Sequence, residues 1–316
     1  MASPRRDGDM AHATPVVVGL IAALCMTAWS IAAGAQAPPA PPAGPHSLSY
    51  RNVVVLQGNP ILLRDMASLD YRYRLYESES RLLRDNYLGF ALRPVLSPGF
   101  SRIGGAVELA PASVVRLGVS WEQVNYFGTF NQLQSFENAS SDYSDARLGA
   151  RADDDQNYAA SGTDISLSLL LQNRLGPVIL RDLFELHRVS YALRPGDGFL
   201  YDPVNDLLVA RRGFTFTNDF DILYISTLGV IAGLRYTVTD ALYPETAGGG
   251  QRNGPTHRLG PSMSYVVFQN PGAAFDSATI FVLLNWWLKH RYRAGAEVSA
   301  AVPFLSVGFS FTGKIL

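Results

Sequence analysis

The sequence predicts an all-β protein, a closed antiparallel transmembrane barrel of about twelve strands, and three observations lead to this fold class. The first is a long run of alternating apolar and polar residues at 220–239. The second is an N-terminal segment with the features of an export signal. The third is a series of strand-length segments joined by connections that alternate between short and long.

In the run at 220–239 every even position is apolar or small, whereas the odd positions include Asp221 and Arg235. A helix repeats its face every 3.6 residues and cannot produce this pattern, but a strand alternates its faces with a period of two. The face with Val230 and Leu234 can contact lipid, and the face with Asp221 and Arg235 cannot. Apolar outside and polar inside is typical of a transmembrane barrel.

The N-terminus begins with Arg5 and Arg6, continues with an apolar run at 15–33, and reaches Ala35-Gln36-Ala37. A positive start, an apolar core and a small-x-small site are the features of a cleaved signal peptide. An uncleaved membrane anchor is the alternative, because the run approaches the length that spans a bilayer. The predicted organisation is a signal peptide at 1–37, a proline-rich linker at 38–46 and a barrel at 47–316.

Composition excludes several classes of function. Cys25 is the single cysteine and lies inside the predicted signal, so the mature chain can form no disulfide, no thiolate zinc site and no thiol nucleophile. The formal net charge of −1 argues against a nucleic-acid partner, which needs a basic surface. No phosphate-binding glycine loop and no metal-spaced histidine cluster is present, so we expect neither a cofactor nor a metal.

Twelve segments have the length and alternation of strands. They are 47–57, 68–76, 86–94, 102–110, 113–124, 163–174, 177–192, 206–217, 220–239, 257–269, 277–290 and 296–312. Short connections fall at 111–112, 175–176 and 218–219, and long ones fall at 125–162, 193–205 and 240–256. Short periplasmic turns and long outer loops are expected of such barrels. The connections at 77–85 and 291–295 break this rule, so ten or fourteen strands remain possible.

The C-terminal segment alternates Leu305, Val307, Phe309 and Phe311 with small polar residues. It resembles the final strand of bacterial outer-membrane β-barrel proteins, which are porin-like in architecture, although 313–316 continues beyond the last aromatic residue. The resemblance implies a place in the bacterial outer membrane, contact with its lipid and lipopolysaccharide, and recognition by the barrel-insertion machinery. It singles out no specific family, and the oligomeric state stays open.

If the alternation holds, one face of every strand lines a lumen. The charged residues assigned to that lining are Arg72, Arg74, Arg102, Glu108, Arg116, Glu122, Arg174, Arg181, Glu185, Asp221 and Arg235, with Asp70, Asp164, Arg211, Arg258 and Lys289 on the same predicted face. Such charges either brace the barrel as ion pairs or line a pore. The modest excess of arginine predicts a weak preference for anions.

These patterns favour a passive pore for small polar solutes, without catalytic residues. A loop such as 125–162 could fold inward and close it; that loop is acidic, so it is either a solvated outer loop or a site for divalent cations or lipopolysaccharide. One alternative function is a non-conducting anchor or an assembly or secretion component. Another is an outer-membrane hydrolase that uses His187 oriented by Glu185, although Ser190 lies on the opposite face. A soluble β-sandwich is the alternative fold.

Overall fold

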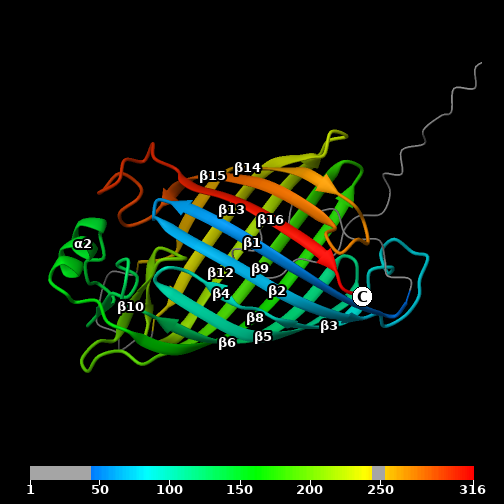
Figure 1. The fold of residues 1–316 in the computed structure, drawn as a ribbon. Coiled ribbons are helices and arrows are strands. Elements are labelled where there is room, and N and C mark those ends of the chain that lie inside the picture. The colour runs from blue at the N-terminus through cyan, green and yellow to red at the C-terminus, as the bar shows by residue number, and fades with distance from the viewer. Residues whose placement is uncertain (1–43, 244–252) are drawn as a thin grey trace, which may run out of the picture.

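The structure is a computed structural model that describes residues 44–243 and 253–316 (Figure 1). The predicted signal peptide at 1–37, most of the proline-rich linker and the middle of the predicted long connection at 240–256 lie outside the described residues. Within the described ranges, no helix is long and apolar enough to cross a membrane.

The barrel wall is one closed antiparallel sheet. Its strands are β1 (His46–Gly58), β2 (Leu62–Tyr73), β3 (Tyr87–Leu92), β4 (Val95–Leu96), β5 (Phe100–Ala112), β6 (Val115–Tyr126), β8 (Ala160–Leu175), β9 (Val178–Tyr191), β12 (Arg212–Ile225), β13 (Val230–Leu242), β14 (Thr256–Gln269), β15 (Ser277–Lys289) and β16 (Phe304–Lys314). Both β3 and β4 pair with β2 and β5, so they share one of twelve positions in the wall. The pairing of β1 with β16 closes the circle, with Ser49 opposite Lys314 and Gly58 opposite Leu305. The predicted barrel of twelve strands is confirmed.

The two ends of the barrel differ in their connections. Both chain ends of the barrel, at the start of β1 and the end of β16, lie at the end where the turns after β5, β8 and β12 are short. The opposite end carries long loops, which contain β7 (Ser135–Phe136), α2 (Asp145–Asp153), β10 (Phe199–Asp202) and β11 (Leu207–Ala210). Figure 1 shows α2 and β10 at one end and the C-terminus at the other. By the usual rule for these barrels, the long loops face the outside of the cell.

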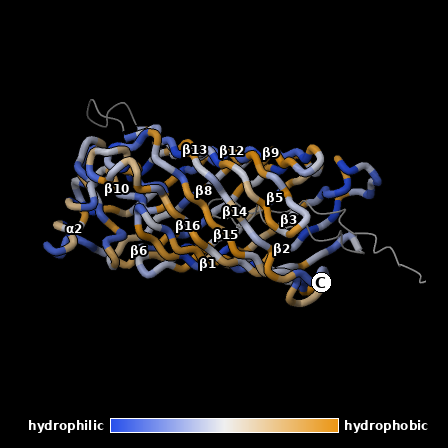
Figure 2. The backbone as a smooth tube through the Cα atoms, turned by 90° about the horizontal axis from the view of Figure 1, so that it is seen from above, coloured by the Kyte–Doolittle hydropathy of each residue, from blue (hydrophilic) through white to orange (hydrophobic). Residues whose placement is uncertain are grey.

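Side chains alternate across the wall as the sequence predicts. On β6, Leu117 and Val119 are 46% and 49% exposed on the outer surface, whereas Arg116 and Ser120 are 4% and 7% exposed. Figure 2 shows hydrophobic and hydrophilic residues alternating along the barrel strands, and hydrophilic residues around α2. An apolar exterior and a polar interior invert the pattern of a soluble protein and suit a barrel surrounded by lipid.

The prediction of a single strand at 220–239 is wrong. The chain turns at 226–229, where Gly229 has a φ of 78° and the Ser226 hydroxyl accepts hydrogen bonds from two backbone N–H groups. The predicted division into an outer and an inner face is nevertheless correct. β12 and β13 pair with Asp221 opposite Arg235, so the odd-numbered residues of both strands lie on one face. The predicted turn at 218–219 instead lies within β12.

Other boundaries differ from the prediction as well, since β2 begins at Leu62 rather than at 68. The segment 206–217 is not one barrel strand, because its first part is β11, which pairs with β10 away from the wall. The outer connection predicted at 291–295 extends over 290–303, and the last strand begins only at Phe304. The additional length makes this connection a long outer loop, as its end of the barrel requires.

We expect Leu167→Arg to impair insertion of the barrel. Leu167 is 53% exposed on the outer face of β8, and an arginine facing lipid near the midplane costs about 2–4 kcal/mol. The measurement is the fraction of refolded protein whose migration on a gel changes after boiling. Ser161→Arg is the matched control, because Ser161 lies on the same face of β8 near the long-loop end. Equal losses in the two variants would show that the lipid-facing band is misplaced.

Candidate functional site

One wall of the lumen carries a ladder of ion pairs across three adjacent strands. Asp221 on β12 lies opposite Arg181 on β9 and opposite Arg235 on β13. Arg181 donates to one Asp221 oxygen at 2.7 Å, and the Nε of Arg235 donates to the other at 2.7 Å. Arg235 also lies 3.2 Å from Asp219. All four side chains are buried, and the strand register therefore brings together three of the residues assigned to the lining.

A second cluster gathers around Glu108 on β5. Arg93 lies 2.5 Å from its carboxylate, and the hydroxyl of Tyr87 donates to it at 2.9 Å. The guanidinium groups of Arg72 and Arg116 lie over the Tyr87 ring, 4.6 Å and 5.8 Å from its centroid. Sequence reasoning missed Arg93, which lies between β3 and β4, because it expected a single strand there.

A third cluster joins Arg102, Glu122, Asp164 and His187. Arg102 lies 3.6 Å from Glu122 and 3.3 Å from Asp164, and His187 Nδ1 lies 3.0 Å from Asp164. The hydrogen-bonded carboxylate of His187 is therefore Asp164 of the neighbouring strand rather than the expected Glu185. A histidine–carboxylate pair can act as a base, but Arg102 also binds this carboxylate and the cluster is enclosed.

Two of the assigned residues lie outside the lumen. Arg74 follows the end of β2 and pairs with Glu77 at 2.9 Å, and Arg174 is exposed at the end of β8, where its Nε donates to the Gly176 carbonyl. Arg74 was placed inside because the strand was extended past its true end at Tyr73, whereas Arg174 is within β8 but next to the exposed turn at Gly176. Glu185 is buried on the inner face of β9, as assigned.

The inner wall is not polar throughout. Towards the long-loop end, a ring of buried apolar side chains faces inward. It includes Val53, Val55, Met66, Val95, Phe100, Val124, Tyr126, Val189, Tyr191, Ala241 and Phe281. Sequence reasoning missed this ring because it assumed polar residues on every inner face. A signal was present, since residues 53–56 are apolar on both faces of β1.

The hairpin of β10 and β11 fills this ring. Leu200, Leu207 and Val209 pack against the ring and are almost fully buried. The opposite side of the hairpin packs into a second cluster that caps the barrel. This cluster contains Phe199, Tyr201, Leu208 and Ala210 of the hairpin, and Phe136, Ala139, Tyr143 and Leu148 from β7, α2 and their loop. The hairpin is therefore held between the barrel and its cap, and closes the outer mouth.

The loop whose hairpin fills the lumen is the one at 193–205, together with β11 that follows it. It is not the loop at 125–162, which the sequence suggested could fold inward. The loop at 125–162 contributes Leu133 to the inner ring and otherwise builds the cap, where β7 pairs with β10. Its predicted alternative role as a cation site is not supported in the described ranges, which contain no cluster of three or more potential metal-binding side chains of Asp, Glu, His or Cys.

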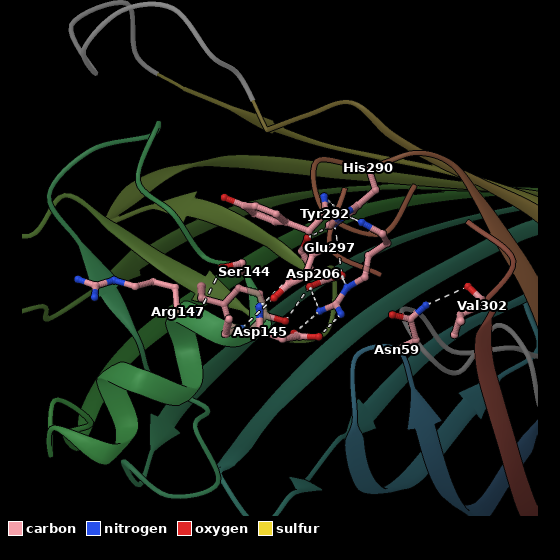
Figure 3. Close-up of polar contacts among 12 residues, drawn as sticks. Asn59, Ser144, Asp145, Arg147, Asp206, His290, Tyr292, Glu297 and Val302 are labelled. Carbon is pink, nitrogen blue, oxygen red and sulfur yellow. Dashed lines mark hydrogen bonds and ion pairs between the residues drawn. The ribbon is translucent and has the colours of Figure 1, made fainter. Parts of the chain in front are cut away.

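An ion-pair lock fixes the hairpin to the cap (Figure 3). Arg293 donates to Asp206 at 2.7 Å through Nε, and its terminal nitrogens donate to Asp145 at the start of α2. His290 Nε2 donates to the Asp206 carbonyl at 2.7 Å. His290 Nδ1 accepts hydrogen bonds from the backbone N–H groups of Tyr292 and Arg293, both at 3.1 Å. One loop thus binds the turn of the hairpin and the helix of the cap.

The same loop also caps α2. The carboxylate of Glu297 accepts hydrogen bonds from the backbone N–H groups of Asp145 and Ala146, each at 2.9 Å. The hydroxyl of Ser144 accepts from the N–H of Arg147 at 3.3 Å. These are unpaired donors of the first helical turn, and a carboxylate placed there also interacts favourably with the helix dipole. The position of α2 over the hairpin therefore depends on the loop at 290–303.

A cavity of about 90 Å³, lined by both polar and apolar side chains, remains beneath the hairpin. The hairpin contributes Asp202, Val204, Asn205 and Val209 to its boundary. The barrel contributes the charged residues Arg64, Arg102, Asp164, Glu185, His187, Asp219, Arg235 and Arg258, together with Gln57, Thr215, Thr217 and Ser306. This chamber, in which many charged side chains meet the apolar ring, is the candidate functional site.

Comparisons with known proteins extend only to the fold. No family model matches the chain, and no curated protein matches it. Among solved structures, the β domain of the Bordetella autotransporter BrkA is 12% identical with a TM-score of 0.41, covering 85% of this chain and 99% of that one. LpxR from Salmonella typhimurium is 9% identical with a TM-score of 0.36, covering 84% and 99%. OmpT, an outer membrane protein of Vibrio cholerae, is 10% identical with a TM-score of 0.30, covering 85% and 98%.

These scores are low, and the fold rests on the strand pairing of the chain itself, which closes the sheet between β1 and β16. The solved structures to which the chain is similar include outer-membrane β-barrels, the class that its last strand resembles. The chain is a closed twelve-stranded antiparallel β-barrel of this architecture.

Proposed function

We propose that the protein is an outer-membrane pore for small polar solutes that the β10–β11 hairpin keeps closed at rest. The observation that carries this proposal is the position of the hairpin, which is packed between the inner apolar ring and the cap. An open diffusion pore would expose its charged lining to water. Here Asp221, Arg235 and Glu108 are 0%, 4% and 2% exposed, which supports a closed state.

The lining beneath the hairpin supports a passage rather than a purely mechanical role. A barrel that only anchors a partner gains nothing from burying many charged groups, because each loses hydration that its ion pairs only partly replace. A polar lining does serve solutes that cross once the hairpin moves aside. The arginines that line the chamber extend the proposal to a preference for anions.

We place this pore in the outer membrane of a bacterium, reached by export with the signal at 1–37. Its apolar exterior would contact lipid and lipopolysaccharide, and the barrel-insertion machinery would recognise its last strand. We propose a transport role rather than a catalytic one, because the pair of His187 and Asp164 lies enclosed and shares its carboxylate with Arg102. A non-conducting anchor or assembly component is the second candidate, favoured by the sealed lumen.

Removing the hairpin should open the pore. We expect the unaltered protein to be silent in planar-bilayer recordings at low voltage. A variant in which residues 200–209 are replaced by a short Gly-Ser linker should conduct steadily, because the inner ring then encloses an unfilled lumen. The matched control replaces residues 77–82, an exposed stretch after β2 at the other end of the barrel that touches neither the hairpin nor its lock, and should stay silent.

The outcomes separate the candidates. A steady current through the unaltered protein would contradict the resting closure. A hairpin variant that is silent, yet still migrates as a folded barrel before boiling, would refute the pore and favour the anchor.

The lock suggests that acid loosens the hairpin. Burial is the main cause that lowers the pKa of His290 from its usual 6.5, and together with weaker repulsion from Arg293 and Arg258 it outweighs the attraction of Asp206. The neutral ring is the form that accepts two backbone N–H groups at Nδ1. Since the pKa is lower in the locked state, the stabilisation is complete above pH 6.5 and falls as the pH drops below that value.

We expect amide hydrogen exchange in residues 199–210, divided by the intrinsic exchange rate, to become faster as the pH is lowered from 7.5 to 5. His290→Gln should remove most of this dependence, whereas His257→Gln should keep it, because His257 lies on β14 outside the lock. Exchange that follows intrinsic rates over this range would show that His290 does not control the hairpin.

A further inference from the structure

We propose that the chamber beneath the hairpin binds a small oxyanion, a phosphate or carboxylate group, between Arg64 and Arg258. Both arginines line the chamber, Arg64 from β2 and Arg258 from β14. The proposal concerns binding and holds whether or not the barrel conducts.

Arg64 is a buried charge without a carboxylate partner. Its side chain is on the inner face of β2 and the residue is 6% exposed. One terminal nitrogen of Arg64 donates a hydrogen bond to the side-chain carbonyl oxygen of Gln57 at 3.3 Å. Among the described residues no carboxylate lies within 4.0 Å of it, and its Nε has no hydrogen-bond partner.

Arg258 is in the same situation. Its guanidinium lies over the rings of Phe304 and Trp287, at 4.2 Å and 5.4 Å from their centroids. No ion pair within 4.0 Å reaches it in the part of the chain that the structure describes, and its Nε is also without a partner. The nearby carboxylate of Asp219 is already bound by Arg235 at 3.2 Å and by the Thr237 hydroxyl at 2.6 Å.

Five other buried arginines of the barrel interior and lock contrast with these two. Arg93, Arg102, Arg181, Arg235 and Arg293 each lie within 4.0 Å of a carboxylate. A buried charge left without a counter-ion is strongly destabilising. Two such charges facing one chamber therefore call for an anion that the described residues do not supply.

The carboxylate that the hairpin brings to the chamber makes no close ion pair with either arginine. Asp202 accepts a hydrogen bond from the backbone N–H of Val204 at 2.9 Å and another from the amide of Asn205 at 2.8 Å. Its two oxygens thus stabilise the turn of the hairpin. No arginine of the described residues lies within 4.0 Å of Asp202.

The remaining unsatisfied groups of the chamber are donors. The amide nitrogen of Gln57 and the hydroxyl of Ser306 are buried without partners, as are the Nε groups of Arg64 and Arg258. Four unpaired N–H or O–H groups around one space match the several acceptor oxygens of a phosphate or carboxylate group. The chamber of about 90 Å³ exceeds several-fold the roughly 10–15 Å³ that one water needs, so a small oxyanion fits.

Inorganic phosphate is the probe. The protein is refolded from urea into detergent in graded phosphate, so that entry past the hairpin is not limiting, and the unfolding midpoint is compared with chloride at equal ionic strength. We expect the midpoint to rise with phosphate and to saturate. Acetate in a parallel series tells whether a carboxylate also binds.

Arg64→Gln and Arg258→Gln should each raise the half-saturating phosphate concentration about tenfold or more, since each removes charge-assisted hydrogen bonds. Ser306→Ala, a smaller change, should raise it less while keeping the fold. Arg174→Gln, which changes an exposed arginine at the other end of β8, should leave it unchanged.

The proposal fails if phosphate shifts the midpoint no more than chloride does. It also fails if the saturation curve is the same in Arg64→Gln, Arg258→Gln and the unaltered protein. Migration before and after boiling verifies that each variant is a folded barrel.

Discussion

The closure of the sheet between β1 and β16 is the constraint on which the rest of the structure depends. Lipid offers no hydrogen-bond partner to an unpaired backbone edge, so every strand must have two neighbours. Closure of an antiparallel sheet by its first and last strands requires an even number of positions, which places both chain ends of the barrel at one end. The long loops then gather at the other end, and this is why α2, β7 and the β10–β11 hairpin meet over a single mouth.

The sequence predicted the barrel, its twelve strands and most inward-facing charges because a period of two is a local signal. The prediction that Arg181, Asp221 and Arg235 face inward is correct, even though 220–239 is a hairpin rather than a single strand. The position of the β10–β11 hairpin inside the barrel could not be predicted in the same way. Residues 207–210 have the composition of a strand, and only tertiary contacts decide that β11 pairs with β10 rather than the wall.

The interior combines two kinds of packing with opposite requirements. The apolar ring needs a partner that excludes water, and the hairpin supplies it through Leu200, Leu207 and Val209. The charged clusters need counter-ions, and most of them find these on adjacent strands. Among the described residues Arg64 and Arg258 are exceptions, and they lie where the hairpin and the charged lining meet. The boundary between the two kinds of packing is therefore where a bound anion has most to contribute.

The packing of the hairpin also determines what could open the barrel. Fully exposing three large apolar side chains costs about 1.5–3 kcal/mol each, so leaving the ring would cost about 5–9 kcal/mol before the lock is counted. A two-state equilibrium biased by that much is closed nearly all the time, and only a differential interaction of similar size can reverse it. Loss of one proton-sensitive contact at His290 is too weak for this alone. Acid can loosen the hairpin, but full opening requires a partner or ligand that binds the open state, at the outer cap or in the chamber.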